Sequence, residues 1–137
     1  MIRFHDNKRP FNKKLLIFIS DFIRKLFGGD RIGRLSKMMI TQSKKIYLQN
    51  KKKITILDFG CGSMEISKKL EELSYVKQIT GVDTFASRFK TKKMKYMQYN
   101  NFFKNNKKKY DLIIIIDVLH HMGIDSSYKI LKKLSKF

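Results

Sequence analysis

The chain has 137 residues, which suffices for one domain with a buried core, and 42% of them are hydrophobic, which excludes a disordered tail. Its single cysteine excludes a disulfide framework and any cysteine-based zinc site. A formal charge of +20 is typical of nucleic-acid-binding proteins. Lysine outnumbers arginine by 25 to 6, however, so a coding bias that leaves a lysine-covered surface explains the high charge equally well. No purely apolar run exceeds five residues and no signal peptide is recognisable, so we expect a cytoplasmic protein without a membrane span.

The first part of the chain has helical periodicity. Apolar residues at helical spacing predict a helix over residues 11–27, which ends before Gly28 and Gly29, and a second helix over residues 35–48. We therefore expect an N-terminal helical segment over residues 1–50. The first of these helices is basic and amphipathic, so peripheral membrane contact through residues 11–27 is an alternative to packing on the core.

From residue 51 onward, short apolar runs alternate with helical patterns. The runs predict four strands, which are Ile54–Leu57, Val76–Val82, Lys95–Tyr99 and Leu112–Ile116. Between and after them we expect three helices, which are Met64–Leu73, Phe85–Lys93 and a last one with Asp125 as its N-cap. Alternation of this kind predicts an α/β core over residues 51–137, with a mostly parallel sheet and right-handed helical crossovers.

Polar residues follow the expected strands, where ligands of such sheets bind. Asp58, Asp83, Asn100 and Asp117 stand at or just beyond the carboxyl ends of the first to fourth strands. The chain has only 11 acidic residues, so three of them at these positions are not explained by composition. We expect these side chains to line one ligand site.

The loop after the first strand gives the sharpest signal. Gly60 and Gly62, on either side of Cys61, allow a tight turn and close approach of a ligand to bare backbone. Such a pair is weak evidence alone, but Asp83 follows Gly62 by 21 residues, where an acid can hold both hydroxyls of a ribose. The third glycine of the dinucleotide fingerprint is replaced by Glu65, and a carboxylate at Asp58 repels a pyrophosphate. A ligand with a cationic end fits better, and S-adenosylmethionine is such a ligand.

The segments ILDFGCGS, GVD and YDLIIIIDVLHH resemble the class I S-adenosylmethionine-dependent methyltransferases, especially their small-molecule group. The resemblance covers roughly Lys53 to Lys136 and implies a Rossmann-like fold with S-adenosylmethionine as methyl donor. It implies that Asp58, Gly60, Cys61 and Gly62 cradle the methionine part, that Asp83 binds the ribose and that Asn100 contacts the adenine. Asp117 either approaches the methionine end or the acceptor, or caps the turn after its strand.

The sequence offers few candidates for a catalytic base or nucleophile. His120 and His121 follow the fourth strand, and either imidazole could take a proton from the acceptor. Methyl transfer often needs only proximity and orientation, however, so a base is not required. Cys61 has no base near it in the sequence and is better explained as a packing residue. We expect no metal site.

The acceptor is not identified by the sequence, and a small-molecule or lipid-like one is favoured. The densest lysine runs, Lys51–Lys53 and Lys107–Lys109, precede strands and so lie opposite the expected site, which disfavours a nucleic-acid acceptor. A basic RNA-binding methyltransferase stays an alternative on charge alone, and a non-catalytic cofactor-binding fragment or split-domain partner is another.

The pattern also ends one helix after the fourth strand, whereas the resembled fold continues with further strands. We therefore expect an incomplete domain, in which Leu112–Ile116 is an apolar sheet edge prone to self-association.

Overall fold

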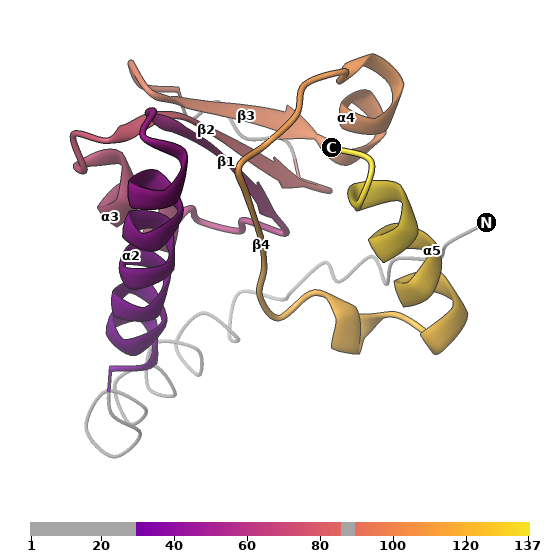
Figure 1. Cartoon of the computed structure of the whole chain (residues 1–137). Coiled ribbons are helices and arrows are strands. Elements are labelled where there is room, and N and C mark those ends of the chain that lie inside the picture. Colours follow the sequence, from indigo (N-terminus) through magenta and orange to yellow (C-terminus); the bar gives the residue numbers. More distant parts are fainter. Residues whose placement is uncertain (1–29, 86–89) are drawn as a thin grey trace. The chain divides into compact units, whose positions relative to one another are not determined.

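The structure is a computed structural model that describes residues 30–85 and 90–137 (Figure 1). The chain forms two compact units, Met1–Arg34 and Leu35–Phe137, and the second contains the whole sheet. The domain boundary expected at residue 50 falls inside that second unit. The expected helix over residues 11–27, with its membrane contact, lies outside the described residues.

The described elements are α2 (Arg31–Asn50), β1 (Ile54–Phe59), α3 (Glu65–Glu71), β2 (Val76–Asp83), β3 (Met94–Gln98), α4 (Tyr99–Asn105), β4 (Leu112–Ile115), the 3-10 turn η1 (Leu119–His121) and α5 (Ile124–Leu134).

The four strands form one parallel sheet in the order β3-β2-β1-β4. Asp58 of β1 is aligned with Gly81 of β2 on one side and with Ile114 of β4 on the other. The expected α/β class, the parallel pairing and the four expected strands are confirmed, with strand ends shifted by at most two residues. All four strands therefore end at one edge of the sheet, which we call the carboxyl edge. Their starting ends form the amino edge.

Helices cover both faces of the sheet, because successive residues of a strand point to opposite sides. Ile54 and Ile56 of β1 belong to one buried cluster, against which residues of α2 and α3 pack. Leu57 and Phe59 of the same strand belong to a second cluster, which includes residues of α4 and α5. The result is a helix–sheet–helix arrangement, which Figure 1 shows with α2 and α3 on one side and α4 and α5 on the other.

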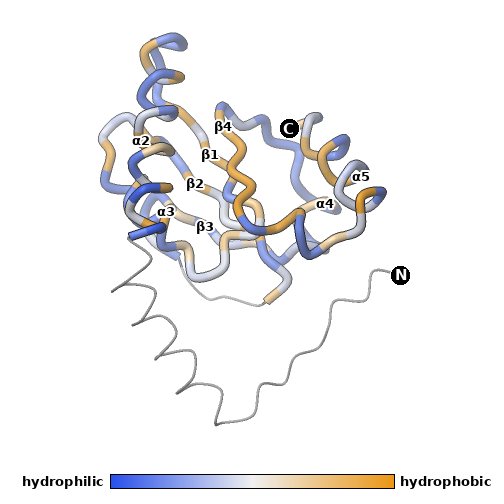
Figure 2. The backbone as a smooth tube through the Cα atoms, turned by 90° about the horizontal axis from the view of Figure 1, so that it is seen from below, coloured by the Kyte–Doolittle hydropathy of each residue, from blue (hydrophilic) through white to orange (hydrophobic). Residues whose placement is uncertain are grey.

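Strand β4 is the last strand of the sheet on its side among the described residues. Figure 2 shows it as the longest continuous hydrophobic stretch of the sheet. Only Ile114 of this strand is fully buried, and its neighbours are half-buried. An apolar strand with a partner on one side only is the arrangement expected from the sequence, and edge-to-edge association stays a proposal.

The helix ends differ from the expectations in three places. Helix α2 begins at Arg31, because Asp30 accepts a hydrogen bond from the backbone N–H of Gly33 at 2.7 Å and so caps it. The N-cap of α5 is Gly123 and not Asp125, which lies in the first turn. The expected helix Phe85–Lys93 is wrong at residues 90–93, which are not helical, and its middle lies outside the described residues.

Candidate functional site at the carboxyl edge

The deepest polar group of the carboxyl edge is the carboxylate of Asp58. Its side chain is 6% exposed, and its Oδ2 accepts a hydrogen bond from the Oγ of Ser67 at 2.6 Å. Burial raises the pKa of this carboxyl from 3.8 to about 6, and the nearby charge of Asp83 adds to the increase, while Ser67 opposes it. A carboxylate in this position gains from a cationic ligand, since no basic side chain of the described chain forms an ion pair with it.

The loop between β1 and α3 turns within a few residues. Gly60 has φ +80°, Gly62 has φ +50°, and Met64 has φ +59° although it is not a glycine. The backbone N–H groups of Gly60 and Cys61 both donate to the carbonyl oxygen of Val82, at 2.7 Å and 3.1 Å. These bonds fasten the start of the loop to β2, while Gly62 and Ser63 remain exposed at its tip.

The two glycines of this loop have different surroundings. A Cβ added to Gly60 would lie 2.0 Å from a γ-methyl of Val118, so this position has no room for a side chain. A Cβ added to Gly62 would meet nothing within 4 Å. The backbone at Gly62 therefore borders open space, which a ligand could approach.

Asp83 closes the site from β2. Its Oδ2 accepts a hydrogen bond from the backbone N–H of Gly62 at 2.8 Å, which joins the loop to the end of β2. Its Oδ1 accepts from the backbone N–H of Thr84 at 2.7 Å and from the Thr84 hydroxyl at 3.2 Å. Asp83 thus holds the tip of the glycine loop, and both of its carboxylate oxygens lie at the carboxyl edge.

Cys61 is a packing residue in this structure. Its Sγ would lie 2.9 Å from a Cβ added to Gly81, so the thiol lies over β2. Burial, followed by the charges of Asp58 and Asp83, raises the pKa of the thiol to about 12. The thiol stays protonated at neutral pH, which is the opposite of what a nucleophile needs.

The third strand ends differently from the expectation. Asn100 does not follow β3 directly: β3 ends at Gln98, and Asn100 is the exposed second residue of α4. Gln98 is aligned with Asp83, and its Nε2 donates to the carbonyl oxygen of Thr84 at 3.4 Å. The adenine contact of Asn100 stays a prediction, and Gln98 lies nearer to Asp83 in the sheet.

The residues after β4 lie at the same edge. Asp117 has φ +56°, a backbone conformation that costs energy for most residues but that aspartate tolerates. His120 and His121 form the 3-10 turn that follows, both are exposed, and their ring centroids are 3.8 Å apart. The order of the strands places this turn beyond β4, next to the glycine loop after β1, as Val118 above Gly60 demonstrates.

Sequence analysis missed Ser67 and Thr84, which hold the two carboxylates. Ser67 is fully buried on α3, between Ile66 and Leu70, so its position on the apolar side of the expected helix was the signal that could have found it. Thr84 follows Asp83 directly, and both its backbone N–H and its hydroxyl donate to the Asp83 carboxylate.

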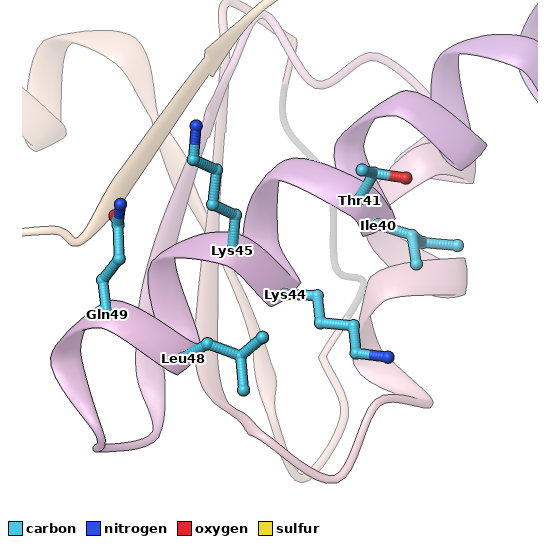
Figure 3. Close-up of a pocket in the computed structure, with 6 residues that line it drawn as sticks. All are labelled: Ile40, Thr41, Lys44, Lys45, Leu48 and Gln49. Carbon is cyan, nitrogen blue, oxygen red and sulfur yellow. The ribbon is translucent and has the colours of Figure 1, made fainter.

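A hollow along α2 is not part of this site. Figure 3 shows its six lining residues, all from that helix: Ile40, Thr41, Lys44, Lys45, Leu48 and Gln49. None of them follows a strand.

Within residues 30–85 and 90–137, no group of three or more potential metal ligands comes together. In that same part of the chain, no helix has both the length and the apolar character that a bilayer span requires.

Comparison with known proteins agrees with this geometry. Residues 29–136 match the family model described as a methyltransferase domain, which covers most of the chain. No curated protein matches, and no solved structure matches. The matched segment contains the whole sheet, the glycine loop and all three aspartates of the carboxyl edge. With its four-stranded parallel sheet between helices, the chain belongs to the methyltransferase-domain family and has the Rossmann-like fold of the class I enzymes.

Proposed function

We propose that the chain binds S-adenosylmethionine at the carboxyl edge and transfers its methyl group to a small-molecule or lipid-like acceptor. The observation that carries the proposal is the position of two carboxylates around one open glycine loop. Asp58 is buried at the root of the loop, and Asp83 holds the loop at Gly62. A ligand with a cationic group at one end and a ribose at the other would complement both carboxylates.

The residues of the site fit this cofactor by charge and by space. The ionised carboxylate of Asp58 would be stabilised by an ammonium group near it, which would offset the cost of its burial. The open backbone at Gly62 leaves room for the methionine part, and Asp83 offers acceptors to the ribose hydroxyls. When bound, S-adenosylmethionine supplies a methyl group that its sulfonium makes electrophilic.

In this reaction the chain would hold the cofactor and orient the acceptor. Methyl transfer is an in-line displacement, so alignment of the acceptor contributes most of the rate. His120 and His121 stand exposed beside the site, where an imidazole could accept the proton that a hydroxyl or amine acceptor releases. Cys61, with its raised pKa, takes no part in the chemistry.

One experiment separates catalysis from mere binding. The full chain is incubated with S-adenosylmethionine and a panel of small phenols, amines and lipid-like acceptors, and S-adenosylhomocysteine is quantified by mass spectrometry. Release that depends on an acceptor supports methyl transfer. Calorimetric binding without release supports the alternative of a non-catalytic cofactor-binding protein, and binding of NAD in place of S-adenosylmethionine contradicts the proposal.

Replacing Asp83 with alanine should weaken S-adenosylmethionine binding by about 1.5–3 kcal/mol, roughly 10- to 150-fold, because charge-assisted hydrogen bonds to the ribose are lost. Titration calorimetry measures the change. Asp125→Ala is the matched control: it removes a carboxylate in the first turn of α5 that the site does not use. Unchanged affinity in the Asp83 variant would show that this acid does not bind the ribose.

Replacing Asp58 with asparagine should stabilise the ligand-free chain at pH 8. The folded pKa of about 6 lies above the ordinary value of 3.8, so the folded state binds the proton more tightly than the unfolded state. The stability associated with this carboxyl is therefore fully present below pH ~3.8 and is lost as the pH rises through about 6. A shift of this size corresponds to at most about 3 kcal/mol, so we expect a gain of about 1–3 kcal/mol at pH 8 and almost none at pH 4. Urea unfolding of both proteins at the two pH values measures it.

The same variant tests whether Asp58 faces a cation. Only the ionised carboxylate attracts one, so the affinity of the unaltered chain for S-adenosylmethionine should fall as the pH drops below about 6. In Asp58→Asn the affinity should be low and nearly independent of pH in that range. Equal affinity in both proteins would exclude a charge interaction between Asp58 and the ligand.

A further inference from the structure

Lysine residues stand at the start of every strand of the sheet. Lys51–Lys53 precede β1, Lys77 is the second residue of β2, Lys92 and Lys93 precede β3, and Lys107–Lys109 precede β4. Because the strands are parallel, these nine lysines gather at the amino edge. We call them the lysine edge.

The loops of the opposite, carboxyl edge contain no lysine and no arginine in their described parts. Residues 60–64, 84–85 and 116–123 hold neither lysine nor arginine, whereas Asp58, Asp83 and Asp117 lie there. A coding bias toward lysine would place lysines in the loops of both edges. In the described loops the lysines instead lie at the amino edge, together with a few acids such as Asp111, so composition alone does not explain the lysine edge.

Few of these charges are neutralised by the protein itself. Lys52 forms an ion pair with Asp111 at 3.3 Å, and Lys52 stays 67% exposed. Lys108 donates to the neutral amide oxygen of Gln78 at 3.0 Å. The Nζ of Lys93 donates to two backbone carbonyl oxygens. The lysine edge therefore keeps most of its positive charge for an external anion.

The shape and chemistry of the lysine edge favour the phosphates of a nucleic acid. Four strand starts at about 4.8 Å spacing form a row of roughly 14 Å, along which a flexible strand can place successive phosphates. Lysine ammonium groups bind phosphate as point charges, and no arginine is present in these segments to read bases.

A membrane surface fits this edge less well. Stable attachment to a membrane needs an apolar signal beside the basic one. The exposed large apolar residues of the described chain are Ile32, Met38, Leu48, Phe85, Ile124, Tyr128 and Leu131, and none of them belongs to the segments that carry the nine lysines. Charge without an apolar anchor is typical of backbone binding to nucleic acid.

We propose that the lysine edge binds the phosphate backbone of a single-stranded nucleic acid, at the edge of the sheet opposite the candidate methyl-transfer site. The strand would tether the protein and would not be the methyl acceptor, because the amino edge and the carboxyl edge lie at opposite ends of the strands. This inference does not depend on which acceptor the site uses.

Fluorescence anisotropy of the full chain with a labelled 20-nucleotide oligouridylate tests the proposal that the lysine edge binds nucleic acid. Affinity should fall steeply with salt, with a slope of log K against log salt of about −3.5 if about five phosphates are neutralised. The triple variant Lys107→Gln/Lys108→Gln/Lys109→Gln should lose at least tenfold in affinity at 50 mM salt, and its slope should become shallower by about 2, since each single-strand contact contributes about 0.7.

A matched control separates a local site from net charge. Lys69→Gln/Lys104→Gln/Lys129→Gln removes three exposed lysines from α3, α4 and α5, and so changes the net charge equally. This control variant should lose less than threefold in affinity for oligouridylate, and circular dichroism should show that both variants are folded. Equal loss in the two variants, no binding of oligouridylate at 50 mM salt, or binding only to vesicles with 30% phosphatidylserine would each overturn the proposal.

Discussion

Replacing Gly60 with alanine is expected to lower the free energy of unfolding by roughly 2–5 kcal/mol, a large share of the 5–15 kcal/mol typical of a domain. Two costs add. The left-handed backbone at φ +80° costs a residue with a Cβ about 1–2 kcal/mol. The Cβ would also lie 2.0 Å from a γ-methyl of Val118, and overpacking of this kind costs about 1–3 kcal/mol. Urea unfolding followed by circular dichroism measures the sum.

The Val118→Ala background separates the two costs. It removes both γ-methyls that stand over Gly60 and leaves the Cβ of residue 118 at 3.3 Å, so the further cost of Gly60→Ala should fall close to the backbone strain, about 1–2 kcal/mol. The difference between the two backgrounds is the coupling energy of the pair. If the cost of Gly60→Ala is the same in both, Val118 does not close over the loop as the structure has it.

The roles of the two glycines could not be distinguished in the sequence. Gly60 and Gly62 stand in one short motif, and both allow a positive φ. Their difference depends on Val118, which lies far along the chain and reaches Gly60 only because β4 pairs with β1. Sequence analysis predicted that a loop is needed here, whereas the tertiary fold decides which glycine packs and which borders open space.

Strands were predicted better than helices, for a physical reason. β1 and β4 are short apolar runs, and β1 is buried along almost its whole length. Such runs are recognisable without knowledge of their neighbours. Helix α4 was missed because its sequence, YNNFFKN, has a low helix propensity. It is stabilised by tertiary packing: Phe102 is fully buried, and its ring lies 5.1 Å from that of Phe137.

The acids of the site were predicted for a similar reason, and their partners were not. Asp58 and Asp83 are identified by their position after apolar runs, which the alternation of strands and helices fixes. The bond from Ser67 to Asp58 joins residues nine positions apart, and the bond from Gly62 to Asp83 spans 21 positions. Such partners follow from the packing of α3 on the sheet and from the pairing of β1 with β2, which local patterns do not contain.

Replacing Gly62 with asparagine is expected to abolish measurable binding of S-adenosylmethionine, a loss of at least 100-fold, while the fold stays within about 1 kcal/mol of the unaltered chain. Asparagine adopts the left-handed backbone at φ +50° with little strain, so the substitution adds bulk without distorting the loop. The backbone N–H that donates to Asp83 is retained. The new side chain points into the open space over the loop, where the methionine part of the cofactor would lie. Titration calorimetry and urea unfolding give the two readouts.

Gly123→Asn is the matched control for that variant. A Cβ at Gly123 also meets nothing within 4 Å, and this residue is the N-cap of α5, where asparagine is favoured. The control should therefore bind S-adenosylmethionine normally and unfold at the same or a higher urea concentration. Gly62→Ala should fall between the two, because its single methyl group occupies less of the space. If Gly62→Asn binds as tightly as the control, the open space over the loop is not the cofactor site, and Asp83 then holds Gly62 only to stabilise a turn.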